Sequence, residues 1–157
     1  MSIPIAIINK DKLSSSNLEI FTNVIFNNFS EISNVPELNH TKQSIYETLK
    51  CSTAQVYLIL VNKKIASYIV GKIMILNDGR RVVYITYLYT AKQFRGKGFA
   101  SVLLSIAEKI NTINMLDGVM LTYDSENIPL HNFYLKKGFM PDLLLRTYKR
   151  HEVLYRG

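Results

Sequence analysis

The chain has 157 residues, of which 48% are hydrophobic and 20% charged, with a formal net charge of +7. These values predict one globular domain over residues 1–157, with enough apolar side chains for a two-sided core. They also exclude several classes of protein. The apolar runs are too short to span a bilayer, and the N-terminus shows no export signal. The single cysteine, Cys51, excludes an intramolecular disulfide. We expect a cytoplasmic protein in a reducing compartment, without membrane or metal.

The positive charge does not by itself identify a partner. The basic residues are spread along the chain, and the aromatic residues follow core-facing patterns instead of alternating with lysine and arginine. We therefore do not expect nucleic acid as the partner. A homodimer is compatible with the composition.

The first elements alternate between strand and helix patterns. A β-favouring run at residues 3–8 predicts an edge strand. One of three serines at 14–16 can cap a following helix. Thr41 can cap a second, shorter helix with Ile45 and Leu49 on its apolar stripe. The apolar face of the first helix holds Leu18, Phe21, Val24, Ile25 and Phe29.

Three neighbouring strands follow in the middle of the chain. Strands at Ala54–Leu60 and Lys64–Leu76 are joined by a hairpin. The dipeptide Asp78-Gly79 is a strong turn signal, and it leads into a strand at Val82–Tyr89. We expect these three strands to be antiparallel neighbours.

A strand–helix–strand crossover comes next. A helix is predicted at Phe99–Ile113 and a strand at Val119–Tyr123, which should lie parallel to the strand at Val82–Tyr89. Pro129 suits the first turn of a helix at Leu130–Lys137.

The chain is expected to end in two strands. They are predicted at Phe139–Tyr148 and Glu152–Arg156, with Arg150-His151 in the turn. The predicted fold class is therefore α/β (α+β), with a mixed, mostly antiparallel central sheet of six to seven strands flanked by about four helices.

The loop after the strand at 82–89 has the chemistry of an anion site. Gly96 and Gly98 have no Cβ, so backbone N–H groups can turn toward an anion, and the helix N-terminus at Phe99 adds further donors. Arg95 and Lys97 add positive charge. A lone Gly-x-Gly is more often an ordinary turn. The loop lacks the Gly-Lys-Ser/Thr ending of a nucleotide P-loop and the acidic residue of a dinucleotide fold.

The order Gln93-x-x-Gly96-x-Gly98 resembles the acyl-CoA pyrophosphate loop of the GNAT (general control N-acetyltransferase) superfamily. The resemblance implies a GNAT-like fold and an acetyl-CoA-dependent N-acetyltransferase without metal. The residues that it places at coenzyme A are Leu88, Tyr89, Thr90, Gln93, Phe94, Arg95, Gly96, Lys97, Gly98, Phe99, Ala100, Asn127 and Tyr134. Within this set, the backbone N–H groups of residues 94–99 are expected to supply most phosphate contacts.

A second segment, Asn127 through Phe139, is similar to another signature of that family, with Leu130 where a small residue is commoner. The resemblance implies that Asn127 contacts the pantetheine arm. It also implies that the Tyr134 hydroxyl donates a proton to the departing thiolate. This role suits a phenol, which is still protonated at neutral pH.

The group that accepts the amine's proton is left open. Many family members use a glutamate on the fourth strand, but residues 81–89 contain no acid. Asp124, at the C-terminal end of the fifth strand, is the acid that the topology places nearest to the predicted site. The alternatives are Tyr84, Tyr87, Glu126 or a water chain. The resemblance further places a backbone oxyanion contact at residues 88–90.

The sequence therefore predicts an enzyme that moves an acetyl group from acetyl-CoA directly to a primary amine of a small molecule, peptide or protein. A noncatalytic acyl-CoA-binding domain is the first alternative, and a basic nucleic-acid-binding module is the second. The identity of the amine is not encoded in any motif.

Overall fold

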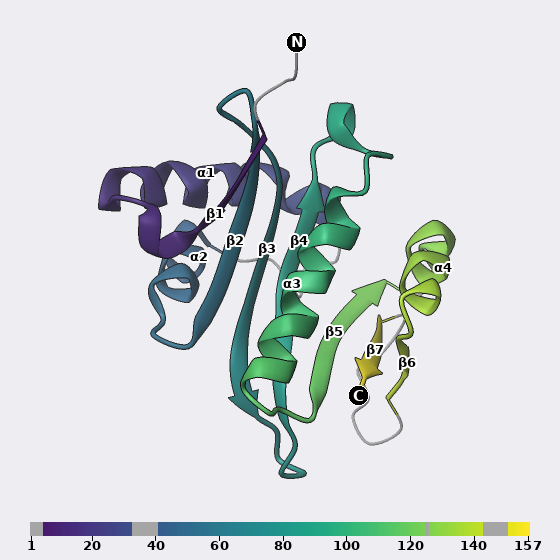
Figure 1. Cartoon of the computed structure of the whole chain (residues 1–157). Helices are drawn as coiled ribbons and strands as arrows, with labels where there is room; N and C mark the ends of the chain where they lie inside the picture. Colours follow the sequence, from purple (N-terminus) through teal and green to yellow (C-terminus); the bar gives the residue numbers. More distant parts are fainter. Residues whose placement is uncertain (1–4, 33–40, 125, 143–150) are drawn as a thin grey trace. The chain divides into compact units, whose positions relative to one another are not determined.

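A computed structural model describes residues 5–32, 41–124, 126–142 and 151–157 of the chain. Its strands form a seven-stranded sheet in the order β1-β2-β3-β4-β5-β7-β6 (Figure 1). The strands are β1 (Ile5–Asn9), β2 (Ala54–Val61), β3 (Lys64–Ile75), β4 (Arg81–Thr90), β5 (Gly118–Asp124), β6 (Met140–Pro141) and β7 (His151–Arg156).

Four α-helices accompany this sheet in the part of the chain that the structure describes. They are α1 (Ser15–Ile32), α2 (Lys42–Lys50), α3 (Phe99–Ile113) and α4 (Ile128–Lys136), with 3-10 turns η1 (Lys10–Lys12) and η3 (Lys92–Phe94). β4 and β5 are parallel, whereas β1 with β2, β5 with β7 and β6 with β7 are antiparallel. The predicted fold class is confirmed.

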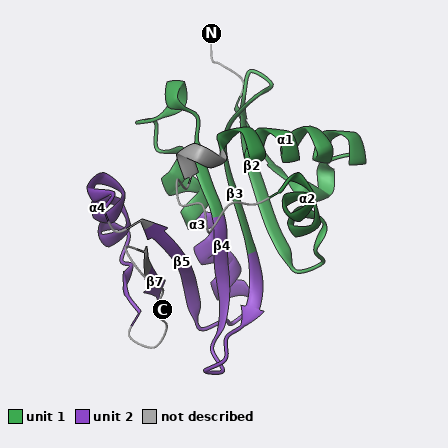
Figure 2. Ribbon diagram, turned by 180° about the vertical axis from the view of Figure 1, so that it is seen from behind, with its two compact units in different colours: residues 1–71, 87–104 green, residues 72–86, 105–157 purple. Residues whose placement is uncertain are grey.

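Contacts divide the chain into two compact units. Unit 1 comprises residues 1–71 and 87–104, and unit 2 comprises residues 72–86 and 105–157 (Figure 2). β3, β4 and α3 each contribute residues to both units. The prediction of one domain over residues 1–157 stays a prediction.

Both helices of the first half of unit 1 begin at the predicted caps. The Ser14 hydroxyl accepts the Asn17 N–H at 3.2 Å at the start of α1. The Thr41 hydroxyl accepts the Ser44 N–H at 3.0 Å at the start of α2. Each cap satisfies a backbone donor that the helix cannot bond internally, which is why the helices begin there.

The core of unit 1 lies between these two helices and the sheet. Phe21 and Ile25 of α1 and Ile45 and Leu49 of α2 are fully buried, in the predicted faces. Their partners in the same cluster are Ala54, Val56, Leu58, Tyr68, Val70, Tyr87 and Tyr89. This packing fixes which side chains of β4 point toward the helices, and so which point away from them.

The two predicted turns are confirmed. Asn62 and Lys63 have φ of 51° and 67° in the β2–β3 hairpin, and Gly79 has φ of 93° in the next turn. The second turn is closed by a hydrogen bond from the Leu76 N–H to the Arg80 carbonyl at 2.8 Å. Left-handed residues of this kind match the twist of the flanking strands.

In unit 2, β5 lies between β4 and β7. Val82 of β4 pairs with Gly118, and Leu121 pairs with Leu154 of β7. Gly118 has no room for a side chain, because an added Cβ would lie 2.5 Å from the Tyr155 ring and 2.5 Å from the Arg156 carbonyl. The glycine is therefore required by close approach and sets the start of β5.

The last part of the chain corrects three predicted boundaries. Phe139 is not in a strand, since its N–H bonds back to the Tyr134 carbonyl at 3.1 Å after Gly138 turns the chain with φ of 91°. The strand there is limited to β6, and the predicted residues 143–148 lie outside the described residues. His151 belongs to β7 and not to a turn. Helix α4 begins two residues earlier than predicted.

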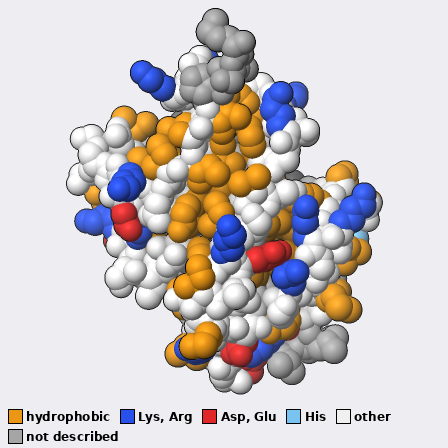
Figure 3. All heavy atoms as spheres, viewed as in Figure 1, with side chains coloured by type: hydrophobic (Ala, Val, Ile, Leu, Met, Phe, Trp, Pro, Cys, Tyr) orange, Lys and Arg blue, Asp and Glu red, His pale blue; other side chains and the backbone are white. Residues whose placement is uncertain are grey.

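One part of the surface of unit 1 is apolar. Ile5 and Ile7 of the edge strand β1 are 59% and 51% exposed. Hydrophobic side chains gather over the region of β1 and β2 (Figure 3). No helix within the described ranges combines the length and the apolar character that crossing a bilayer requires.

A partly buried ion cluster joins the β3–β4 turn of unit 2 to the residue after β6. Arg80 contacts Asp142 at 2.8 Å and Asp78 at 2.8 Å, and its guanidinium lies 4.7 Å from the centre of the Tyr155 ring. Hydrogen bonds to Asp142 and then to Asp78 raise the pKa of Arg80. A hydrogen bond from Arg80 lowers the pKa of Asp78. The Asp142 side chain is 4% exposed and that of Asp78 is 24% exposed.

We expect Asp142→Asn to lower the free energy of unfolding by about 1–3 kcal/mol, because it removes a charge-assisted bond to a partly buried guanidinium. The matched variant Asp78→Asn should cost clearly less, since that pair is more exposed and better screened by solvent. Urea unfolding measures both changes. Equal effects of the two variants would contradict the assignment of the Arg80–Asp142 pair as the stabilising one.

Candidate active site

The glycine loop of unit 1 is built between β4 and α3. After β4 ends at Thr90, the turn η3 is closed by the Phe94 N–H on the Ala91 carbonyl at 2.8 Å and by the Arg95 N–H on the Lys92 carbonyl at 3.3 Å. The chain then reverses through two left-handed glycines before α3 begins. This places a tight, polar turn directly before a helix N-terminus, as the sequence predicted.

Both glycines have the geometry of a cradle. Gly96 and Gly98 have φ of 78° and 82°, and a Cβ added at either would meet no atom within 4 Å. The first bond of the helix runs from the Val102 N–H to the Gly98 carbonyl at 3.1 Å, so the donors of the preceding turn remain for another acceptor. The N–H groups of Phe94 and Arg95 are already used in η3. The first backbone N–H group of the loop that could bind an anion is therefore that of Gly96.

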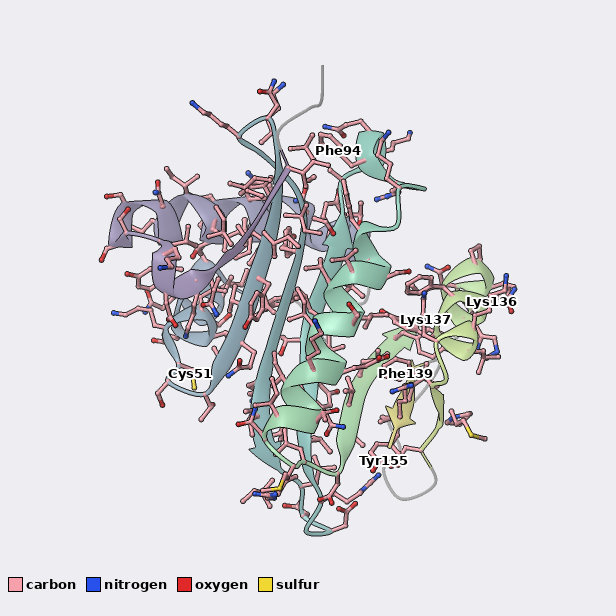
Figure 4. The ribbon with its side chains drawn as sticks, viewed as in Figure 1. Cys51, Phe94, Lys136, Lys137, Phe139 and Tyr155 are labelled. Carbon is pink, nitrogen blue, oxygen red and sulfur yellow. The ribbon has the colours of Figure 1, made fainter. Side chains whose placement is uncertain are left out.

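Side chains hold the ends of this loop together. Arg95 donates from Nε to the Thr90 carbonyl at 2.9 Å, and its guanidinium lies 5.7 Å from the centre of the Tyr89 ring. The rings of Phe94 and Phe99 lie 6.5 Å apart across the loop. Figure 4 shows Phe94 on the η3 segment. Gln93 and Lys97 are exposed. Arg95 thus has a positioning contact as well as a charge.

Ser67 fixes the end of β4, and the sequence analysis missed it. Its hydroxyl is fully buried, donates to the Tyr89 carbonyl at 2.8 Å and lies 2.8 Å from the Thr90 hydroxyl. This bond ties β3 to the segment where the family resemblance expects the thioester. The available signal was one hydroxyl residue inside an apolar strand, which requires a partner when buried.

Tyr134 is enclosed by aromatic rings in unit 2. It is 5% exposed, and its ring meets those of Phe133 at 5.4 Å, Phe139 at 5.6 Å and Tyr123 at 5.9 Å, each edge-on. Figure 4 shows Phe139 just below α4, which carries Lys136 at its end. Burial raises the pKa of the Tyr134 hydroxyl well above its ordinary value. The group is therefore held protonated.

Tyr123 and His131 form a pair beside Tyr134 that the sequence analysis did not find. The Tyr123 hydroxyl is hydrogen-bonded to His131 Nδ1, and the two rings stack with centres 5.9 Å apart. Helical spacing was the signal for His131, because it precedes Tyr134 by three residues and shares its face of α4. Alternation along β5 was the signal for Tyr123.

Asn127 is engaged as a helix cap. Its side-chain oxygen accepts the Leu130 N–H at 3.1 Å at the start of α4. The side-chain nitrogen is the group that remains for a ligand. The predicted pantetheine contact of Asn127 would therefore be made by donation.

The structure separates the candidates for the proton acceptor. The Tyr84 hydroxyl is 2.5 Å from the Thr122 hydroxyl. Tyr87 lies in the core of unit 1, where burial raises its pKa to about 12. Glu126 is exposed. Asp124 is the last residue of β5, as predicted, and pairs with His151 of β7.

Comparison with known proteins gives a consistent picture. The model of the acetyltransferase (GNAT) family matches residues 24–139. The streptothricin acetyltransferase of Escherichia coli is 33% identical over 82 residues, covering 52% of this chain and 47% of that protein. The aligned part thus spans about half the length of that relative.

Solved structures of low identity share the fold. Arabidopsis thaliana NAA60 in complex with acetyl-CoA has a TM-score of 0.73 at 13% identity, covering 97% of both chains. The PaiA N-acetyltransferase of Thermoplasma acidophilum in complex with coenzyme A has a TM-score of 0.73 at 20% identity, covering 99% of both chains. At these identities the likeness shows the fold alone.

The buried tyrosine predicts a dependence of stability on alkaline pH. Below pH 10 the Tyr134 hydroxyl is neutral in both the folded and the unfolded chain. Above that pH the unfolded chain ionises first, because burial raises the folded pKa, so the free energy of unfolding falls as pH rises. In Tyr134→Phe this fall should be shallower by up to about 1.4 kcal/mol per pH unit between pH 10 and 12. Urea unfolding at stepped pH measures it. Parallel curves for both proteins would refute the burial effect.

Proposed function

We propose that this chain, which belongs to the acetyltransferase (GNAT) family, transfers an acetyl group from acetyl-CoA to a primary amine of a small molecule, peptide or protein. Family membership makes the chain an acyltransferase. This chain shares its fold with proteins whose structures contain acetyl-CoA or coenzyme A, which supports acetyl-CoA as the donor. The direct transfer to an amine and the roles of individual residues are the proposal.

The observation that carries the proposal is the glycine cradle before α3. Two left-handed glycines with open space at their Cβ positions lie next to the unbonded N–H groups of a helix N-terminus. This arrangement suits a diphosphate, which needs several backbone donors and close approach of the chain. Lys97 and Arg95 supply positive charge at the same loop. These residues fit the pyrophosphate of coenzyme A.

When bound, acetyl-CoA would supply an activated acyl group and a thiol leaving group. The residues of the chain would hold the bound donor in place and protonate the departing sulfur. Residues 88–90 at the end of β4, fixed by Ser67, would align the acyl carbonyl through the backbone. The Asn127 side-chain nitrogen would hold the pantetheine arm. The Tyr134 hydroxyl would donate its proton to the departing sulfur.

The two proton steps make different demands on the site. Burial favours the neutral form of Tyr134, so the hydroxyl is available as a hydrogen-bond donor at every physiological pH. The amine's proton needs a separate acceptor, for which the sequence offers Asp124, at the end of β5, or water.

Binding at the loop predicts a sharp effect of a single methyl group. We expect Gly96→Ala to weaken acetyl-CoA binding by tenfold or more, because the Cβ enters the open space of the cradle and φ of 78° disfavours alanine. The matched control is Gly79→Ala, which carries the same kind of backbone strain at φ of 93° in the β3–β4 turn, also with open space. Its affinity should stay within twofold of the wild type. Titration calorimetry measures both, and equal affinities would exclude the loop as the binding site.

The acid role predicts a split between turnover and binding. We expect Tyr134→Phe to lower kcat about 10²- to 10⁴-fold, since it removes the proton donor and keeps the ring packing. The dissociation constant of acetyl-CoA should change less than threefold. Tyr155→Phe is the control, because it also deletes one tyrosine hydroxyl bond, to the Asp117 carbonyl at 2.5 Å. An unchanged kcat in Tyr134→Phe, with the acyl-transfer step shown to be rate-limiting, would remove Tyr134 from this role.

A further inference from the structure

We propose that His131, acting through the hydroxyl of Tyr123, takes up the proton that the amine loses, and that its positive charge then assists Tyr134. This inference rests on the proposed acetyl transfer and adds to it the proton acceptor that the sequence left open. All three side chains belong to unit 2.

The contacts form a continuous chain from the helix surface to the buried acid. His131 is half-buried on α4, and its Nδ1 is hydrogen-bonded to the Tyr123 hydroxyl. The Tyr123 ring, 5% exposed, stacks on His131 and meets the Tyr134 ring edge-on at 5.9 Å. Histidine is the side chain that most readily gains and loses a proton near neutral pH. A histidine that is hydrogen-bonded to a buried tyrosine next to Tyr134 is suited to accept a proton.

The energetics of Tyr134 require such a charge. A thiol has an ordinary pKa near 8.5, below that of a tyrosine hydroxyl, so transfer from the phenol to a thiolate is unfavourable. Burial makes the transfer harder, because it raises the pKa of Tyr134 further. A positive charge formed close by favours the phenolate and lowers this barrier. Protonated His131 on the same helix face would supply that charge at the moment it is needed.

Other charged groups lie on α4 and on the elements beside it, and Glu126, which is exposed, directly precedes the α4 cap. β5 contributes Tyr123 itself. From β7, Arg156 approaches Gly138 and is 3.5 Å from Glu108 of α3. On α4 itself and its cap, Lys136 is exposed and Lys137 lies 5.7 Å from the centre of the Phe133 ring. Among the described contacts, the His131 ring meets Tyr123, and the Tyr123 ring in turn meets Tyr134.

The proton steps balance within one turnover. The neutral amine attacks the acyl carbon and forms the new N–C bond. The proton that its nitrogen then loses goes to the Tyr123 oxygen while the Tyr123 proton passes to His131 Nδ1. The C–S bond breaks, and the sulfur takes the proton of Tyr134. The excess proton on His131 then returns through water to the Tyr134 oxygen. All three side chains recover their starting state, and no further reactant is consumed.

The alternative acceptors are less suited. The Tyr84 hydroxyl is bound to Thr122, and β-strand alternation places Thr122 and Tyr123 on opposite faces of β5. Tyr87 has a pKa raised to about 12 by burial, which opposes the ionised form that a base requires. Asp124 remains the competitor and is therefore an arm of the test.

The test uses the full chain, acetyl-CoA and two primary amines of different pKa chosen from a thiol-release screen. In the wild type, kcat/KM against pH should show a limb near neutral pH with one midpoint for both amines. His131→Gln keeps a hydrogen-bonding side chain but cannot take up a proton. It should abolish this limb and lower kcat at least tenfold, with KM for acetyl-CoA within twofold.

A structural role would give a different pattern. Tyr123→Phe keeps the ring packing and should match His131→Gln, and the double variant should lose no more than either single variant. Tyr155→Phe should retain the limb. Persistence of the limb in His131→Gln, or its loss in Asp124→Asn alone, would overturn the proposal. Multiplying losses in the double variant would also overturn it.

A second measurement does not depend on turnover. The ring nitrogen signals of His131, followed by NMR in the free protein, should report the hydrogen bond at Nδ1, and Tyr123→Phe should shift the Nδ1 signal. A His131 signal that is insensitive to Tyr123→Phe would refute the pair. If the wild type binds acetyl-CoA but acetylates no amine in the screen, the proposed function fails, whereas the NMR result still decides the pair.

Discussion

The register of β5 is the constraint on which the chemistry of unit 2 depends. Gly118 admits no side chain against Tyr155 and the Arg156 backbone, so β5 can begin against β7 only where the glycine falls. Side chains on a strand alternate with a period of two, and a slip by one residue would exchange the two faces. Tyr123 would then leave α4, and Thr122 would take its place. A glycine five residues away thus determines which hydroxyl can meet Tyr134.

In unit 1 the corresponding constraint lies where β4 ends and α3 begins, at the proposed anion site. The core of α1 and α2 packs on Tyr87 and Tyr89, so the face of β4 is settled before the loop begins. Ser67 then anchors the final carbonyl of Tyr89, and Arg95 anchors that of Thr90. Both carbonyls thus have side-chain partners, and the donors of the loop come from the left-handed glycines and the helix start.

The sequence predicted most of the fold because its signals are local. Caps at Ser14 and Thr41, the turn at Gly79 and the periodicity of α3 each depend on a few neighbouring residues, and all were confirmed. The end of the chain was harder. A β-favouring run at residues 139–148 suggested a strand, but the Phe139 N–H donates to the Tyr134 carbonyl at the end of α4. A contact formed across a helix end cannot be found from strand propensity.

The sequence predicts the part of the candidate site that is carried by motifs and does not indicate the part that is carried by contacts. The glycine loop and Tyr134 are predicted from their spacing, whereas Ser67, Tyr123 and His131 stand out only through their partners on other elements. Such partners depend on strand pairing and helix placement, which composition does not specify.

The surroundings of Tyr134 combine two opposing requirements. Three edge-on contacts between aromatic rings enclose its ring, and the same burial disfavours the phenolate that proton donation leaves behind. A permanently charged neighbour would resolve this at the expense of a stable, neutral core. His131, which contacts this cluster through Tyr123, belongs to the side-chain type that most readily changes its charge in a reaction. In the proposed mechanism the aromatic packing holds the ring of Tyr134 in place, and the histidine assists the donation of its proton.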